Sequence, residues 1–373
     1  MNTPIRSCLW CLHVLWTIAN LLFAGCSGIK WLGLSKANLT WTASQDCRYA
    51  FKMRYLDAGQ QHFCKRYFEA MPYVAKASRE ARIACQTQFY HHRWNCSSVE
   101  LAPNYLNDLK QGTREQAFVA ALSSAAVVHS LAKACAAGSL PNCNCGPMPN
   151  EPPSGDFKWG GCADDVSYGM KVSRLFTDVP YNFKYQASYQ QKKKDRIVTW
   201  KKSRMARAEL TLHNQLAGRR VVESSLTRHC KCHGVSGSCQ IRTCWKSLPT
   251  MKEISEQLYR NFKRAVEVRR QGITNSFEPI YPLISHLTAE TLLFSSKSPD
   301  HCTPDEKFGS LGTKNRICNA TSSGPDNCGS MCCGRGHFSY MKRVPVSCNC
   351  KYIWCCRVEC QSCQQWVHVT RCK

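Results

Sequence analysis

The sequence predicts a disulfide-rich α+β fold in two domains, on the basis of three observations. Apolar and small residues recur at helical spacing through much of the first two thirds of the 373-residue chain. Twelve cysteines stand in the 71 residues from Cys302 to Cys372. Between these regions, residues 246–301 contain no cysteine. This division predicts a helical first domain and a separately cross-linked second domain.

The N-terminus predicts a signal peptide over residues 1–28. Arg6 precedes an apolar run over residues 8–25, and the three residues that follow are small, as at a cleavage site. The run is short for a membrane span and carries two polar side chains, which favours cleavage over a membrane anchor. Cleavage leaves 24 of the 27 cysteines, an even number that can pair fully in the oxidising secretory pathway.

The first domain, residues 29–270, is expected to be helical. Thr113 with Gln116 resembles a capping box, and small or apolar residues then recur at three- and four-residue steps until Gly138 ends the run. Further helices are predicted at residues 67–85, where Pro72 would start or kink the helix, at 210–226 and at 251–265. Residues 271–301 are expected to be a linker because they lack cysteine and contain several prolines.

The second domain, residues 302–373, is expected to depend on disulfides, because its cysteine density leaves little room for an apolar core. The stretch from Tyr352 to Val358 is typical of a β-hairpin and places the adjacent Cys355 and Cys356 at its turn. We expect a long, flat, disulfide-linked projection in which Cys355 and Cys356 are also oxidised.

The formal net charge of +25 is far more than solubility requires and predicts a polyanionic partner. An extracellular protein is not expected to meet nucleic acid, which leaves sulfated glycans or anionic lipid. The densest basic block lies within residues 192–207, and its candidate heparan sulfate residues are Lys192, Lys193, Lys194, Arg196, Lys201 and Lys202. The alternative to glycan binding is that this block is a solvated or disordered loop, which is the usual behaviour of like-charge runs.

The sequence HCKCHGVSGSCQIRTCW, residues 229–245, holds four cysteines around a small uncharged loop. Across a β-hairpin over residues 230–244, Cys232 can pair with Cys239 at the tip and Cys230 with Cys244 at the base. Small loops gain little entropy from such closure, so two bonds here favour rigid presentation of the tip.

Ser236 at the centre of this loop is a candidate modification acceptor. Gly234 and Gly237 supply permissive backbone on both sides of it and leave its hydroxyl exposed. The competing interpretation is a serine chosen only for turn chemistry.

Two other chemistries fit this motif poorly. Zinc binding by Cys230, Cys232 and His233 is disfavoured, because a secreted chain oxidises its thiols and the paired spacing of structural zinc sites is missing. Serine hydrolysis would need a glycine two residues after Ser236, and Ser238 stands there; His213 would be the nearest upstream base.

Five segments occur in one order along the chain: RWNCS (93–97), GTREQAFVAALSSAAVVHSLAKAC (112–135), WGGCADDVSYG (159–169), CKCHGVSGSC (230–239) and CNCKYIWCC (348–356). In this order they resemble the Wnt family of secreted, lipid-modified signalling glycoproteins. The segments IKWLGLSK (29–36) and ELAPNYL (100–106) are similar to the Wnt-eleven subgroup.

The resemblance implies a saposin-like helical N-terminal domain with a lipidated hairpin and a cytokine-like C-terminal domain with a second finger. Between these two regions the family grips the cysteine-rich domain of Frizzled receptors. By position, Ser236 would carry palmitoleate, attached by the acyltransferase Porcupine. The implied receptor-binding residues are Val235, Ser236, Gly237, Trp354, Cys355 and Cys356.

The resemblance also implies partners and modifications. The carrier Wntless would act in secretion, a Notum-type esterase would remove the lipid, and heparan sulfate proteoglycans would hold the protein in the extracellular matrix. No catalytic residue, metal or cofactor is expected beyond covalent palmitoleate and N-glycans. Similarity to the subgroup implies β-catenin-independent signalling in cell polarity and movement. The candidate N-glycosylation sites are Asn38, Asn95 and Asn319. Glycosylation of Asn95 would compete with disulfide formation at the neighbouring Cys96.

Overall fold

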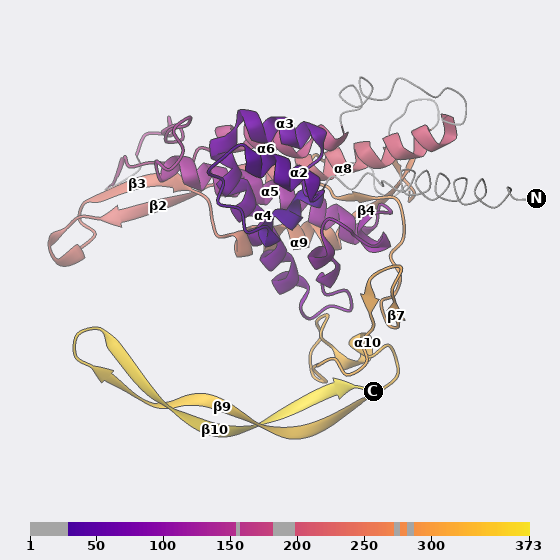
Figure 1. The fold of residues 1–373 in the computed structure, drawn as a ribbon. Helices are drawn as coiled ribbons and strands as arrows, with labels where there is room; N and C mark the ends of the chain where they lie inside the picture. Colours follow the sequence, from indigo (N-terminus) through magenta and orange to yellow (C-terminus); the bar gives the residue numbers. More distant parts are fainter. Residues whose placement is uncertain (1–28, 154–156, 182–197, 272–276, 282–286) are drawn as a thin grey trace, which may run out of the picture. The chain divides into compact units, whose positions relative to one another are not determined.

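The computed structural model describes residues 29–153, 157–181, 198–271, 277–281 and 287–373 (Figure 1), and of residues 198–204 the backbone only. The predicted signal peptide lies outside these residues. So do Lys192, Lys193, Lys194 and Arg196 of the basic block and the side chains of Lys201 and Lys202. The described chain forms two compact units. The first unit takes the described parts of Met1–Gln88 and Ser98–Ser298, and the second takes Phe89–Ser97 and Pro299–Lys373.

Helices build the first unit. α5 (Arg114–Ala136) lies among α6 (Val166–Thr177), α8 (Val198–Ser224) and α9 (Met251–Lys263) and packs against all three (Figure 1). By length and composition α5 could cross a membrane, yet 94% of its most apolar window is buried within the protein, so it is the core helix of this unit. The other α-helices in the described residues of the unit are α2 (Gln45–Lys52), α3 (Ala58–Arg66) and α4 (Met71–Phe89). The 3-10 turns in its described residues are Lys30–Lys36, Phe68–Ala70, Ser97–Leu101, Asn107–Leu109, Val179–Tyr181 and Val235–Gly237.

The start of α5 follows the predicted pattern with one difference. The hydroxyl of Thr113 accepts a hydrogen bond from the backbone N–H of Gln116 at 3.1 Å, which caps the helix. The side chain of Gln116 accepts from the backbone N–H of Gly112 at 2.7 Å instead of reaching back to Thr113. Small residues then let helices approach closely: a Cβ on Gly218 of α8 would stand 2.0 Å from a carbonyl oxygen of α5.

The other predicted helices exist with shifted boundaries. Pro72 is the second residue of α4, where its fixed φ is compatible with a helix start, so it does not kink the helix. The helix predicted over residues 210–226 begins earlier, at Val198. Residues 198–209 carry no apolar period, but they contain Lys, Arg, Met, Ala and Glu, which are good helix formers.

A short sheet occupies part of the segment expected to be a linker. Its order is β5 (Phe277–Pro279), β4 (Val266–Arg270) and β6 (Leu293–Phe294), with β4 antiparallel to β5 and parallel to β6. Val266 and Leu293 are buried in one apolar cluster with Leu210 of α8. The described part of residues 271–298 therefore belongs to the first unit, through strands too short to leave a periodic signal in the sequence.

The second unit is dominated by one antiparallel ribbon. β9 (His337–Ile353) pairs with β10 (Arg357–Cys372), with a register shift between Glu359 and Gln361. The ribbon twists along its length (Figure 1) and is not flat as expected, because a two-stranded ribbon has no further strands to limit its twist. The second unit also contains β7 (Pro304–Asp305), β8 (Ser310–Leu311) and α10 (Cys328–Met331).

Five disulfides lie within residues 302–372 of the second unit: Cys302–Cys333, Cys318–Cys328, Cys332–Cys372, Cys348–Cys363 and Cys350–Cys360.

The early segment Phe89–Ser97 is part of this second unit through arginine side chains. The guanidinium of Arg316 donates to the backbone carbonyls of Tyr90 at 2.7 Å, His92 at 2.5 Å and Arg93 at 2.8 Å. Arg93 in turn donates to the backbone carbonyl of Ser330 at 3.0 Å. Bonds from a side chain to a distant backbone have no sequence signature, which is why this segment was not assigned to the second domain.

Candidate functional site

The motif at residues 229–245 forms a β-hairpin that projects from the helices of the first unit (Figure 1). β2 (Thr227–Cys232) and β3 (Arg242–Ser247) are antiparallel and pair Cys230 directly with Cys244. β1 (Phe157–Trp159) extends the sheet by pairing in parallel with β3. β1 pairs with Arg242, Thr243 and Cys244, the half of β3 nearest the tip, so the third strand supports the hairpin up to the start of the tip loop.

Two disulfides cross this hairpin. Cys230 and Cys244 are bonded with their Cα atoms 4.1 Å apart, and Cys232 and Cys239 are bonded with their Cα atoms 4.6 Å apart. These pairs match those expected from the sequence. The second bond closes a loop of few residues, so it restrains the tip itself.

The backbone of the tip is tightly turned around Ser236. The N–H of Gly234 donates to the carbonyl of Ser238 at 2.8 Å, and the N–H of Gly237 donates to the carbonyl of Gly234 at 3.0 Å. Ser236 has φ 56° and ψ 26°, in the left-handed region that a non-glycine residue enters only under restraint. A Cβ on Gly234 would stand 1.9 Å from the hydroxyl oxygen of Ser238, so this position has room only for glycine.

The hydroxyl of Ser236 is exposed and, within the described residues, makes no hydrogen bond. Its neighbour Val235 is 90% exposed, so the tip presents an apolar side chain beside an unengaged hydroxyl. Ile241, which the sequence analysis did not single out, is 63% exposed on the same loop. An aliphatic residue in a loop of glycines, serines and polar residues was the signal that could have identified it.

Hydrolysis at Ser236 lacks its partners in the described structure. His213 lies on α8, where its Nε2 and the backbone carbonyl of Thr291 are 2.8 Å apart. Because the carbonyl can only accept, Nε2 carries the proton, and burial lowers the pKa of the imidazole. His213 is therefore a neutral, structurally engaged histidine.

The tip of the β9–β10 ribbon is the second exposed apolar site. Trp354 is 89% exposed, and Tyr352 and Val358 beside it are 67% and 62% exposed. Cys355 and Cys356 both have positive φ, of 63° and 81°, as expected at a tight turn. Large apolar side chains at this density on a projecting turn are typical of an interaction site.

The expectation that Cys355 and Cys356 are disulfide-bonded is not met. Both are free thiols in the structure, and their sulfur atoms lie 3.4 Å apart, beyond the length of an S–S bond. Adjacent residues have Cα atoms about 3.8 Å apart across a trans peptide, closer than disulfides usually span. The other cysteines of the described residues are disulfide-bonded.

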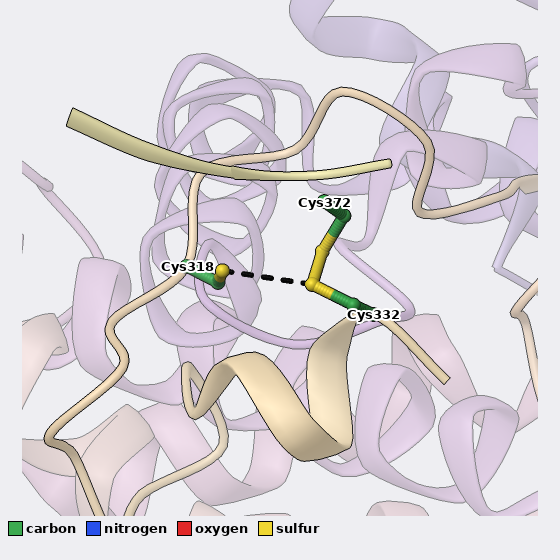
Figure 2. A group of neighbouring side chains, drawn as sticks. All are labelled: Cys318, Cys332 and Cys372. Atoms are coloured by element: carbon green, nitrogen blue, oxygen red, sulfur yellow. Dashed lines mark hydrogen bonds between the residues drawn. A yellow bond between two sulfur atoms is a disulfide. The ribbon is translucent and has the colours of Figure 1, made fainter. Parts of the chain in front are cut away.

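A group of three cysteines in the second unit has the composition of a metal site but not its chemistry. Figure 2 shows Cys318, Cys332 and Cys372, with the sulfurs of Cys318 and Cys332 3.5 Å apart. Cys332 is bonded to Cys372, and Cys318 is bonded to Cys328. Disulfide sulfurs carry no thiolate charge, so the cluster is two packed disulfides and not a metal ligand set.

The three sequons lie in different surroundings. Asn38 and Asn319 are exposed, and the side chain of Asn319 accepts hydrogen bonds from the backbone and hydroxyl of Thr321. Asn95 is half-buried, and its side-chain oxygen accepts from the backbone N–H of Ser97 at 3.2 Å. Cys96 is disulfide-bonded, which is the competing event expected at this sequon.

Comparison with known proteins agrees with this arrangement. The wnt family profile matches residues 52–373. Protein Wnt-11 of Gallus gallus is 42% identical over 352 residues, covering 93% of this chain and 94% of that protein. Protein Wnt-11b-2 of Xenopus tropicalis is 41% identical over 352 residues, covering 93% and 95%. A chain of the solved complex of human WLS with WNT8A is 33% identical with a TM-score of 0.58, over 82% of this chain and 95% of that one. The chain belongs to the Wnt family, whose members are signalling ligands and not enzymes.

Proposed function

We propose that this protein is a secreted, palmitoleoylated ligand for the cysteine-rich domain of Frizzled receptors. The observation that carries the proposal is the hydroxyl of Ser236, exposed at the end of a hairpin that two disulfides restrain. A group held in this way can enter the active site of an acyltransferase without unfolding of the protein. Val235, Gly237, Trp354, Cys355 and Cys356 are the proposed contacts around the lipid and at the second tip.

The acyl chain supplies most of the affinity in this proposal. At about 0.8 kcal/mol per buried methylene, a sixteen-carbon chain contributes on the order of 10 kcal/mol before the costs of association. The exposed tips add contacts that select the receptor. Signal transfer then consists of bringing receptors together, which requires no chemistry by the ligand.

Substitution Ser236→Ala tests the proposal. The variant should be secreted with a free energy of unfolding within about 0.5 kcal/mol of the wild type, because one exposed oxygen is removed. It should bind the Frizzled cysteine-rich domain at least about a hundredfold more weakly, since the lipid is lost. The matched control is Ser238→Ala, which removes a hydroxyl from the same loop and should leave both lipid and binding intact. Full-strength receptor binding by a wild-type protein whose Ser236 peptide has no lipid in the mass spectrum would refute the proposal.

The partners in biosynthesis and turnover follow from the lipid. The similar solved chain comes from a complex with WLS, which supports carriage of this protein by Wntless during secretion. We propose Porcupine as the acyltransferase and a Notum-type esterase as the enzyme that removes the lipid. The similarity to Wnt-11 proteins supports action in the β-catenin-independent branch that controls cell polarity and migration. N-glycans are proposed at Asn38, Asn95 and Asn319.

A second proposed partner is heparan sulfate, supported by the net charge of +25. The candidate residues Lys192, Lys193, Lys194, Arg196, Lys201 and Lys202 form its densest basic block. Replacing Lys192, Lys193 and Lys194 with serine should lower the salt concentration at which the protein elutes from heparin. An unchanged elution position would remove this block from the proposal.

A further inference from the structure

The hairpin that carries Ser236 is connected to the helices through a dense set of polar contacts at its base. β3 ends at Ser247, and α9 begins at Met251, so residues 247–250 form the junction between hairpin and helix. One oxygen of Asp164 accepts three hydrogen bonds there: from the backbone N–H of Leu248 at 2.6 Å, from the hydroxyl of Ser247 at 2.9 Å and from the ammonium of Lys133 at 2.8 Å.

Lys133 and His129 connect the same junction to α5. The ammonium of Lys133 also donates to the hydroxyl of Ser247 at 2.8 Å and to the backbone carbonyl of Leu248 at 2.9 Å, so its three donors are all engaged. One helical turn earlier, Nε2 of His129 donates to the backbone carbonyl of Pro249 at 3.0 Å. α5 thus contacts two consecutive carbonyls of the junction.

These hydrogen bonds are important because the carboxylate that accepts them is buried. The side chain of Asp164 is 4% exposed and that of Lys133 is 34% exposed, so the carboxylate lacks solvent and depends on its three donors. The backbone of Asp164 is itself held on the hairpin, since its N–H donates to the carbonyl of Lys246 at 3.2 Å. Asp164 therefore joins strand β3, the junction and the core helix at one point.

The junction borders a groove of about 790 Å³, and Leu248, although buried, is part of its lining together with Lys133 and Pro249. The polar bonds of Asp164, Lys133 and His129 therefore hold the junction beside a groove in the surface of the helical unit.

We propose that Asp164, acting through Lys133, is a positioning residue that holds the lipid-bearing hairpin in a fixed direction relative to the helical unit. This inference rests on the proposed function, in which the receptor is contacted by the lipid at Ser236 and by a second tip at Trp354. A ligand with two contacts binds strongly only when both can engage at once, and a swivelling hairpin reduces that probability. Chemistry that involves the lipid alone does not depend on the direction of the hairpin.

The test uses the full-length secreted protein produced with its acyltransferase. Asp164→Asn is the main variant, and Asp165→Asn is its matched control. That control makes the same change one residue later and keeps the cap of α6, because asparagine caps as well as aspartate. If Asp164→Asn is not secreted, Lys133→Met and its control Lys76→Met form a second pair of variants. Lys133→Arg tests whether a conservative change, which keeps the positive charge, restores receptor binding.

Three measurements separate positioning from a general role in stability. Relative to Asp165→Asn, Asp164→Asn should bind the Frizzled cysteine-rich domain about tenfold more weakly. Its Ser236 lipid should be present at the same occupancy and be removed by a deacylating esterase at the same rate. Amide hydrogen exchange should accelerate in the peptide over residues 245–250 and stay unchanged between Cys230 and Cys244, which their disulfide restrains.

Equal receptor affinity and equal exchange in Asp164→Asn and Asp165→Asn would overturn the inference. A changed rate of esterase cleavage would also overturn it, because it would show that the surroundings of the lipid are altered. So would faster exchange throughout the helical unit, which would show general loosening. If the wild-type protein carries no lipid at Ser236, the proposed function fails, while the exchange measurement still decides whether Asp164 fixes the hairpin.

Discussion

Ser236 and Gly234 show how single residues define the proposed acylation site. Ser236 occupies the left-handed region at φ 56°, a conformation that costs a non-glycine residue about 1 kcal/mol. The Cys232–Cys239 bond and the hydrogen bonds of the loop hold it there. The backbone at Ser236 is therefore set before any enzyme binds, which reduces the ordering cost of the proposed acylation.

Gly234→Ala should disrupt this arrangement without unfolding the protein. The new methyl group would overlap Ser238, whose hydroxyl and carbonyl oxygens would lie at 1.9 and 2.5 Å, so the loop has to open. We expect lipid occupancy at Ser236 to fall severalfold, measured by mass spectrometry of the tip peptide. The global free energy of unfolding should change by less than about 1 kcal/mol because the tip is exposed.

Ser238→Ala is the control for this variant, because it removes only the hydroxyl and keeps the backbone bond from Gly234 to Ser238. If Gly234→Ala and Ser238→Ala are acylated to the wild-type extent, a tightly turned loop is not required for modification.

At the scale of elements, the two hairpins are held by disulfides more than by packing. An isolated two-stranded ribbon is marginally stable in water, yet β9 and β10 continue for 17 and 16 residues. Cys348–Cys363 and Cys350–Cys360 link them near the tip, as Cys230–Cys244 and Cys232–Cys239 link β2 and β3. Cross-links thus substitute for a second layer of structure.

The double substitution Cys232→Ser/Cys239→Ser should separate the tip from the stem. β2 and β3 keep their register and the Cys230–Cys244 bond, so the hairpin should persist while the tip loses its restraint. We expect severalfold lower lipid occupancy at Ser236 and faster amide exchange over residues 233–238.

A disulfide away from the hairpin provides the comparison. Cys47→Ser/Cys64→Ser removes a bond between α2 and α3 and should lower the free energy of unfolding by about 2–4 kcal/mol. The lipid occupancy of the secreted fraction should be unchanged. Equal losses of lipid in the two double variants would contradict a specific role for the tip bond.

Elements with a strong local pattern could be predicted from the sequence. Thr113 and the apolar period that follows it predicted α5, and the cysteine spacing predicted the hairpin of Ser236 and both of its disulfides. The free thiols at Cys355 and Cys356 could not be predicted, because an even number of cysteines does not say which of them form bonds. The contacts of Asp164 could not be predicted either, since its donors come from residues 31 positions before it and more than 80 after it.

At the scale of the whole molecule, disulfides are the covalent cross-links of the described residues. The cluster of Cys318, Cys332 and Cys372 in Figure 2 has each sulfur in a covalent S–S bond. Removing metal ions should therefore leave its geometry unchanged. Reduction should have a large effect, since each native disulfide contributes about 2–5 kcal/mol in small secreted domains.

Thermal unfolding with and without a chelator tests this distinction. We expect EDTA to leave the unfolding midpoint of the secreted protein unchanged and dithiothreitol to lower it strongly. A midpoint that falls in EDTA alone and recovers with added zinc would show that a metal contributes to the fold.

The bounds of the two units could not be predicted from the composition of the sequence. Composition placed a linker at residues 271–301, but the first unit continues to Ser298 and the second takes in Phe89–Ser97. Composition describes stretches of chain, whereas a unit is defined by contacts between stretches. The bonds from Arg316 to Tyr90, His92 and Arg93 are such contacts.

Those bonds also impose an order of events on biosynthesis. His92 leaves the ribosome 224 residues before Arg316, and at 5–20 residues per second this interval lasts roughly ten to forty seconds. Throughout that time the carbonyls of this segment lack the guanidinium that will satisfy them, and both α4 before the segment and α5 after it are translated before Arg316. The segment has to wait in the lumen of the secretory pathway, hydrated or held by a chaperone, until translation delivers its partner.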